Sequence, residues 1–106
     1  MTSPEFRAEL AAFVAERDWE QFHTPENLAK SIAIEAGELL ECFQWSAEGE
    51  TESVRSELAD VLTYCLLLAE RIGADPEELV RAKLEVTKGK YPIDRSRGSS
   101  ARYDAM

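Results

Sequence analysis

Three of the four prolines in this chain directly follow a residue type that caps helices well. They occur in the pairs Ser3-Pro4, Thr24-Pro25 and Asp75-Pro76. The side chain of Ser, Thr or Asp accepts hydrogen bonds from the first turn of a helix. Proline suits the next position because the N–H that it lacks has no helical partner there. Each pair therefore predicts the start of a helix, and together they indicate a chain built from helices.

Apolar residues recur every three or four positions after these starts, and no segment alternates at period two as a half-buried strand does. A further helix follows the acidic loop 47–52 and ends at Gly73, a residue type that often ends helices. The predicted helices cover residues 4–17, 25–45, 53–73 and 76–89. We expect an all-α, four-helix bundle-like domain over residues 1–92 and a basic tail without regular structure over residues 93–106.

The charge distribution limits the partners of the protein. The formal net charge is -9, which argues against polymeric nucleic acid and anionic membranes as partners. Residues 1–79 carry 18 acidic and 5 basic side chains, whereas residues 80–106 carry 3 acidic and 7 basic ones. The basic segment either balances the charge of the acidic helices or supplies cations that contact phosphate groups.

Two further features concern the compartment. No apolar run approaches the roughly 20 residues of a membrane span, and the first residues lack the basic and apolar regions of a signal peptide. We therefore expect a cytoplasmic protein. Cys42 and Cys65 each lie within an apolar helical pattern. In a reducing compartment such cysteines are usually small buried hydrophobic residues and not disulfide partners, so we expect both to be buried.

Acidic residues interrupt the apolar pattern of two predicted helices. In the second helix the core-facing positions are Leu28, Ile32, Leu39 and Phe43. With about 100° of rotation per residue, Glu35 projects within this stripe and Glu38 on its flank. In the third helix Glu57 and Asp60 lie together at one edge of the apolar face, and Tyr64 continues that edge. The apolar face consists of Val54, Leu58, Val61, Leu62, Cys65 and Ala69.

Carboxylates in such positions need compensation. Two acids three residues apart repel by about a few tenths of a kcal/mol on a helix surface, and partial burial raises the cost. A hard divalent cation removes this cost by accepting oxygen ligands from all four acids. Magnesium fits better than zinc, because Cys42, Cys65 and His23 show no zinc-ligand spacing. Chance also produces such spacing in a chain with 21 acidic residues, so spacing alone leaves solvated acids as an alternative.

Other kinds of catalytic site lack support in the sequence. The chain has one histidine, and no nucleophile elbow surrounds any Ser or Cys. It has neither a Walker A loop nor a G-x-G-x-x-G motif. Water activated by a bound metal ion is the chemistry that remains.

The segments around the acids resemble the MazG-like all-α nucleotide pyrophosphohydrolases, in particular their small dCTP pyrophosphatase branch. The resemblance covers residues 15–103, and E-x-x-E and E-x-x-D occur in order on successive predicted helices. The matching segments are RDWEQFHTPENLAKSIAIEAGELLECFQW, SELADVLTYCLLLAERIG, K-x-x-x-x-K-x-K-Y-P and SRG. By resemblance, Glu35, Glu38, Glu57 and Asp60 bind Mg²⁺, with Mn²⁺ as a substitute.

The resemblance also assigns substrate-binding residues. Trp19, His23 and Trp45 match positions that line the base pocket in this branch, and Tyr64 matches a position beside the second acidic motif. Core packing is the alternative for each Trp, and a capping or loop role is the alternative for His23. Lys83 and Lys90 match substrate-contacting positions of the fourth helix, and Tyr91, Arg97 and Arg102 match the phosphate-facing end more weakly. The chain departs from the pattern at Thr87, where relatives commonly carry asparagine.

The resemblance implies an enzyme that splits a nucleoside triphosphate, dCTP or a modified dCTP, into monophosphate and pyrophosphate. The metal orients the anhydride bridge and activates water, and the edge position of Glu38 makes it the candidate general base. Other substrates of the superfamily stay open, namely dUTP, a broad set of nucleoside triphosphates, and phosphoribosyl-ATP. A non-enzymatic helical module whose acidic face binds a basic partner or buffers metal is a further alternative.

The length of the chain favours an assembly. Four helices in about 100 residues leave apolar surface that one chain does not cover. The third helix is apolar on nearly all sides between Val61 and Ala69, so it needs neighbours on more than one side. We expect a homo-oligomer, and the resemblance favours a tetramer, with a dimer as the alternative.

Overall fold

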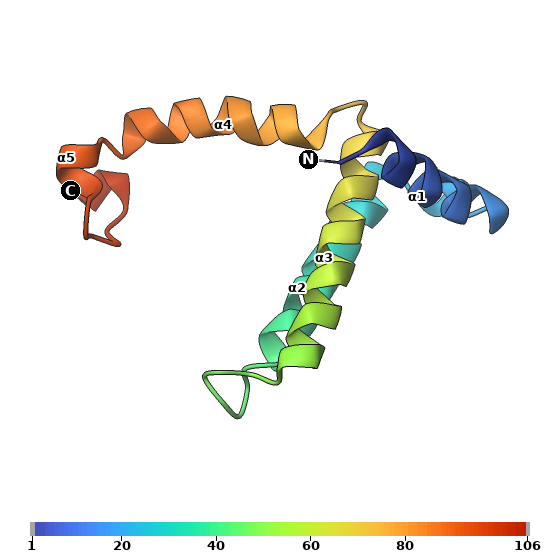
Figure 1. Ribbon diagram of the computed structural model, residues 1–106, viewed down its shortest axis with the longest axis horizontal. Coiled ribbons are helices and arrows are strands. Elements are labelled where there is room, and N and C mark those ends of the chain that lie inside the picture. The colour runs from blue at the N-terminus through green and yellow to red at the C-terminus, as the bar shows by residue number, and fades with distance from the viewer. Residues whose placement is uncertain (1, 106) are drawn as a thin grey trace. The chain divides into compact units, whose positions relative to one another are not determined.

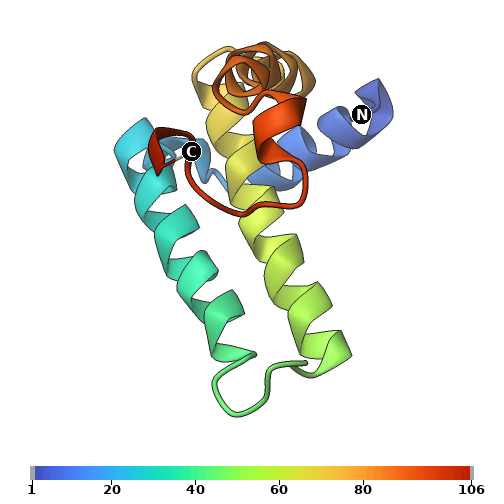
Figure 2. The same cartoon turned by 90° about the vertical axis from the view of Figure 1, so that its left-hand side faces the viewer.

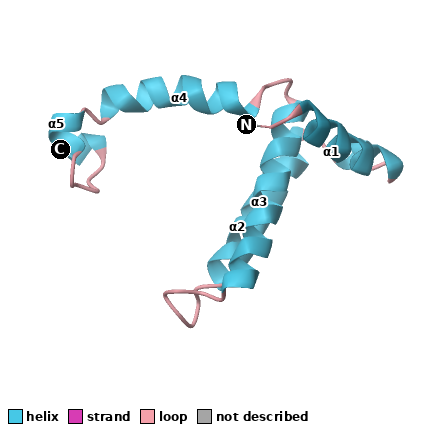
Figure 3. Cartoon of the chain, in the orientation of Figure 1, coloured by secondary structure: helices cyan, strands magenta, loops and turns pink. Residues whose placement is uncertain are grey.

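The computed structural model describes residues 2–105, and all regular structure within them is helical (Figure 3). The all-α prediction is therefore confirmed for the described residues. The α-helices are α1 (Pro4–Glu16), α2 (Pro25–Glu41), α3 (Thr51–Arg71), α4 (Pro76–Lys90) and the short α5 (Ile93–Ser96). Two single 3-10 turns complete the elements, η1 (Glu20–Phe22) and η2 (Tyr103–Ala105).

The first two helices begin as their capping pairs predicted. The Ser3 hydroxyl accepts a hydrogen bond from the Phe6 N–H at 3.1 Å, and the Thr24 hydroxyl accepts one from the Asn27 N–H at 3.1 Å. The predicted start of the third helix was two residues late. Here the Glu50 carboxylate caps the helix by accepting hydrogen bonds from the backbone N–H groups of Glu52 and Ser53.

Helix α2 is shorter than the sequence predicted and ends four residues before Trp45. Hydrogen bonds from Cys42 to Leu39 and from Phe43 to Leu40 tighten the last turn into 3-10 geometry. The following loop turns back at Gly49, whose φ of +68° and whose Cβ-free backbone allow close packing. A Cβ at this glycine would lie 3.0 Å from both Phe43 and Val54, so the loop requires glycine here.

The C-terminal residues also differ from the expectation of an irregular tail. They contain α5 and η2. The rings of Tyr91 and Tyr103 meet edge to face with centroids 5.9 Å apart, and the Lys90 ammonium lies 4.8 Å from the Tyr103 ring centroid. These contacts supply local order that the polar sequence did not reveal.

The chain forms two compact units, one up to Asp75 and one from Pro76 onward. In the first unit α2 and α3 run antiparallel, side by side, and are joined by the loop that contains Gly49 (Figures 1 and 2). Helix α1 meets the C-terminal end of α3, where the Arg7 guanidinium lies 3.3 Å from the Glu70 carboxylate. The division at residue 92 between a domain and a tail stays a prediction.

The buried apolar side chains of the described residues are few, namely Val14, Leu28 and Ala69. On α2, Leu28 is 1% exposed, and Ile32, Glu35 and Leu39 are half-buried, as the predicted stripe requires. Phe43 was predicted in the core but is exposed, because it lies beyond the end of α2.

The prediction of which α3 residues face the core was wrong in part. Leu58 and Leu62 are exposed by 43% and 53%, whereas Glu57, Val61 and Tyr64 are half-buried. The difference arises because α3 is apolar on several sides and α2 covers only one of them. The covered side includes the acidic edge.

The expectation that both cysteines are buried was wrong, because α2 covers only one side of α3. Both are free thiols, Cys42 is half-buried, and Cys65 is exposed instead of buried. Among residues 2–105, no helix combines the length and the apolar character that crossing a membrane requires.

Candidate metal centre and adjoining cavity

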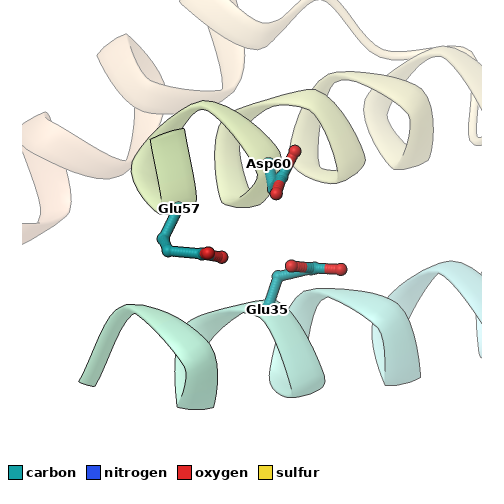
Figure 4. Close-up of side chains that lie close together, drawn as sticks. All are labelled: Glu35, Glu57 and Asp60. Carbon is teal, nitrogen blue, oxygen red and sulfur yellow. The ribbon is translucent and has the colours of Figure 1, made fainter. Parts of the chain in front are cut away.

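Three carboxylates from two helices converge in the first unit. Glu35 projects from α2 toward α3, and Glu57 and Asp60 project from α3 toward α2 (Figure 4). One oxygen from each side chain lies within 4.8 Å of the others. Their spacing in the sequence explains the geometry, because residues three apart share a helix face and the two faces oppose each other.

Burial makes this group different from an ordinary acidic surface. The Oε2 atoms of Glu35 and Glu57 are buried, and neither accepts a hydrogen bond from residues 2–105. A buried carboxylate oxygen without a partner is costly, so the fold holds two oxygens that need a cation or a proton. An all-carboxylate donor set suits Mg²⁺ or another hard divalent cation.

Glu38 lies next to the acidic group and is exposed. It lies outside the group of three close oxygens, yet its carboxyl neighbours both Glu35 and Glu57. Burial raises the pKa of Glu35, and the carboxyls of Glu38, Asp60 and Glu57 raise it further. Burial likewise raises the pKa of Glu57, with Glu38 and Asp60 adding to the effect. Both carboxyls therefore hold protons more readily than an isolated glutamate, and a bound cation would reverse that tendency.

An open cavity of about 380 Å³ lies in the same unit, on the N-terminal side of Glu35 along α2. Its lining residues are Trp19, Phe22, His23, Asn27, Leu28, Ser31 and Tyr64. A second cavity of about 330 Å³ shares Trp19, His23 and Tyr64 with the first and also reaches Asp60. The shared residues thus connect an aromatic cavity to the carboxylate group.

The turn between α1 and α2 positions the shared wall of the two cavities. Asp18 has a φ of +52°, in the left-handed region that non-glycine residues rarely adopt. Gln21 Nε2 donates hydrogen bonds to both the backbone and the side-chain oxygen of Asp18, each at 3.0 Å. The Trp19 ring then packs edge to face on Phe13, with centroids 5.5 Å apart. Local sequence in this short turn therefore sets the direction of Trp19.

The structure brings together some of the sequence-predicted site residues and separates others. Trp19, His23 and Tyr64 line the cavity beside the carboxylates. Trp45 follows the opposite end of α2, is 90% exposed, and lines neither cavity. Lys83, Lys90 and Tyr91 belong to the second unit. Their substrate contacts, like those of Arg97 and Arg102, stay predictions.

Sequence reasoning missed three lining residues, Phe22, Asn27 and Ser31. Asn27 and Ser31 did carry a signal, because they precede Glu35 by eight and four residues and therefore share its helix face. Their polar side chains looked like ordinary solvent-exposed positions near a helix start. Phe22 carried no comparable signal.

These helices and carboxylates define an all-α protein whose acidic group, able to hold a metal ion, lies beside an aromatic cavity. The sequence model of the MazG-like family matches residues 30–106. The chain belongs to the MazG-like family.

Individual relatives agree with this assignment. The chain is similar to dCTP pyrophosphatase 1 of Rattus norvegicus, with 39% identity over 96% of this chain and 66% of the relative. The human dCTP pyrophosphatase 1 is also 39% identical, over 99% of this chain and 68% of the relative. The chain thus spans about two thirds of the length of these relatives.

A solved structure of a pyrophosphatase from Archaeoglobus fulgidus is similar as well, with a TM-score of 0.78 and 41% identity. The similarity covers 83% of this chain and 90% of that one. The helical arrangement described above is therefore one that a known pyrophosphatase also adopts.

Proposed function

We propose that this protein is a Mg²⁺-dependent pyrophosphohydrolase that converts dCTP, or a modified dCTP, to the monophosphate and pyrophosphate. One observation carries the proposal: the unpaired buried oxygens of Glu35 and Glu57 lie with Asp60 beside an aromatic cavity. The names of the similar proteins, dCTP pyrophosphatase 1 and a pyrophosphatase, support the same reaction and substrate class.

The carboxylates of Glu35, Glu57 and Asp60 would hold the metal, and Glu38 would complete the ligand set from the exposed side. When bound, Mg²⁺ neutralises phosphate charge and lowers the pKa of water for attack on the anhydride. Glu38 is exposed, so it reaches solvent as a general base once the neighbouring carboxylates are engaged as ligands. Trp19, His23 and Tyr64 would enclose the base and position the phosphates toward the carboxylates.

Trp45, which the resemblance assigns to the base pocket, lies away from the cavity of its own chain. If Trp45 stacks on the base, a neighbouring chain must supply it, because α2 separates this residue from the cavity of its own chain. Exposed apolar residues on both long helices, such as Ile34, Leu40 and Leu62, offer the surface for such contacts. A homo-oligomer, with a tetramer favoured over a dimer, would cover them. Light scattering on the purified chain tests this assembly, and a monodisperse active species of 11.9 kDa contradicts it.

Lys83, Lys90 and Tyr91 would contact the phosphates. The basic residues Arg97 and Arg102 would add to this group. An acidic metal site attracts a triphosphate poorly without such cations, which is the physical reason for assigning them this role. We also propose a cytoplasmic location, where the nucleotide substrates are found.

The deciding experiment measures pyrophosphate release from a panel of nucleotides, with Mg²⁺ and with EDTA. The panel includes dCTP, dUTP, the ribonucleoside triphosphates and phosphoribosyl-ATP, so it also separates the superfamily substrates. We expect metal-dependent release that is fastest with dCTP or a modified dCTP. Absence of release from every nucleotide would favour a non-enzymatic acidic module.

A further inference from the structure

The side-chain amide of Asn27 is held in one orientation at the cavity. Its Nδ2 donates a hydrogen bond to the Phe22 carbonyl oxygen at 3.0 Å. Because a carbonyl oxygen only accepts hydrogen bonds, the NH₂ group of Asn27 must face Phe22. The Oδ1 atom on the other side of the amide accepts no hydrogen bond from residues 2–105 and is available to a ligand in the cavity that Asn27 lines.

Asn27 also stands at the start of a row that leads to the carboxylates. Asn27, Ser31 and Glu35 lie four residues apart on α2 and share one helix face. With a rise of 1.5 Å per residue, the row from Asn27 to Glu35 extends about 12 Å. Ser31 lines the same cavity, between the other two. A nucleotide whose phosphates lie at Glu35 therefore has its base near Asn27.

We propose that Asn27 Oδ1 accepts a hydrogen bond from the exocyclic amino group of a cytosine base, and that this residue selects cytosine over uracil. The inference rests on the proposed function, because it places the base of the nucleotide substrate in this cavity. Uracil carries an oxygen where cytosine carries the amino group. A uracil oxygen would therefore face Oδ1, which is a second acceptor, and the contact would be repulsive.

Rotation of the Asn27 amide does not relieve this repulsion. A rotated amide presents its NH₂ group to uracil but turns Oδ1 toward the Phe22 carbonyl oxygen. Two acceptors then face each other there, and the hydrogen bond that ties η1 to α2 is lost. The preference for cytosine over uracil thus depends on Phe22 as well as on Asn27, since the Phe22 carbonyl sets the orientation of the Asn27 amide.

The experiment compares kcat/KM for dCTP and dUTP in the wild type and three variants. We expect the wild type to prefer dCTP, and Asn27→Ala to reduce the dCTP to dUTP ratio about five- to tenfold, the effect of one hydrogen bond. Asn27→Asp loses the hydrogen bond to the Phe22 carbonyl, so kcat/KM should fall for both substrates. Its dCTP preference should remain, because a carboxylate presents an acceptor oxygen to the base in either orientation. Lys30→Ala is the matched control on α2. This exposed side chain pairs with Glu26 at 2.7 Å and lines neither cavity, so the ratio should not change.

The ratio separates base recognition from a structural role. If Asn27→Ala only loosens the turn that carries Trp19, both substrates slow equally and the unchanged ratio overturns the proposal. If Asn27→Ala does not fold, Asn27→Asp decides alone, and loss of its dCTP preference overturns the proposal. A wild type that hydrolyses dCTP and dUTP equally overturns this inference only, whereas a wild type that hydrolyses neither, nor any other triphosphate, overturns the proposed function.

Discussion

Glu35 of α2 and Glu57 of α3 face each other across the helix pair, and each keeps one buried carboxylate oxygen without a hydrogen-bond partner (Figure 4). Two like charges in this arrangement destabilise the metal-free fold. A bound cation would offset this destabilisation. The stability of the helix pair should therefore depend on cation binding. The first two predictions test that link.

Neutral amides at the centre should stop turnover without harming the fold. Glu35→Gln and Asp60→Asn each remove a repulsive charge from the acidic group, so the metal-free variants should melt at the wild-type temperature or above it. Pyrophosphate release should fall to background in both. Glu26→Gln, an exposed acid on the same helix, is the control and should retain wild-type turnover. Near-wild-type turnover in either site variant contradicts the metal-ligand assignment.

Magnesium alone should stabilise the protein. A ligand at about a hundredfold excess over its Kd adds about 2.7 kcal/mol to the free energy of unfolding. Thermal melting with and without Mg²⁺, in the absence of nucleotide, measures this effect. We expect Glu57→Gln to show a much smaller shift than the wild type, because it replaces a buried ligand oxygen. Equal shifts in both proteins would mean that Mg²⁺ binds elsewhere.

Trp45→Ala should raise KM more than it lowers kcat if the ring stacks on the base in a neighbouring chain. Stacking acts equally in the ground state and the transition state, and it contributes on the order of 1–3 kcal/mol. Because the ring is 90% exposed in the single chain, we expect the variant to fold. Steady-state kinetics with light scattering separates loss of stacking from loss of assembly. Unchanged KM in an assembled variant excludes the stacking role.

Asp18→Gly tests the strained turn before Trp19. Glycine adopts a positive φ without steric cost, whereas a left-handed non-glycine residue costs on the order of 1 kcal/mol or more. The glycine also removes the side-chain oxygen that accepts a hydrogen bond from Gln21. We expect the melting temperature to be preserved in Asp18→Gly and reduced in Asp18→Ala, which loses the hydrogen bond and keeps the strain. Equal stabilities would show that the turn carries no backbone strain.

Glu50 should make stability depend on pH. Hydrogen bonds from the Ser53 side chain and from the backbone N–H groups of Ser53 and Glu52 lower the pKa of Glu50 below its ordinary value of 4.5. The stabilisation is therefore complete above pH 4.5 and is lost as the pH falls through the lowered pKa. Thermal melting between pH 3 and 6, about 1.5 units on either side of that ordinary value, measures this effect. The melting temperature of Glu50→Gln should fall less on acidification than that of the wild type. An identical acid-induced loss would exclude a contribution from this cap.

Some of the fold and site follows from the sequence by itself. The pairs Ser3-Pro4 and Thr24-Pro25 predicted two helix starts, because capping depends on groups within one turn. The place of Glu35 among the half-buried residues of α2 also followed from spacing, since helical periodicity is local. The acidic pairs on two helices and their resemblance to a known family suggested a metal site.

Tertiary structure alone decided which side of each helix is covered and what lies beside the site. Helix α3 is apolar on several sides, so the position of α2 decides that Glu57 is half-buried and Leu62 exposed. The cavity role of Asn27 likewise depends on Phe22, which belongs to another element and orients its amide. Periodicity within one helix determines which residues share a face, but it does not determine which neighbour that face meets.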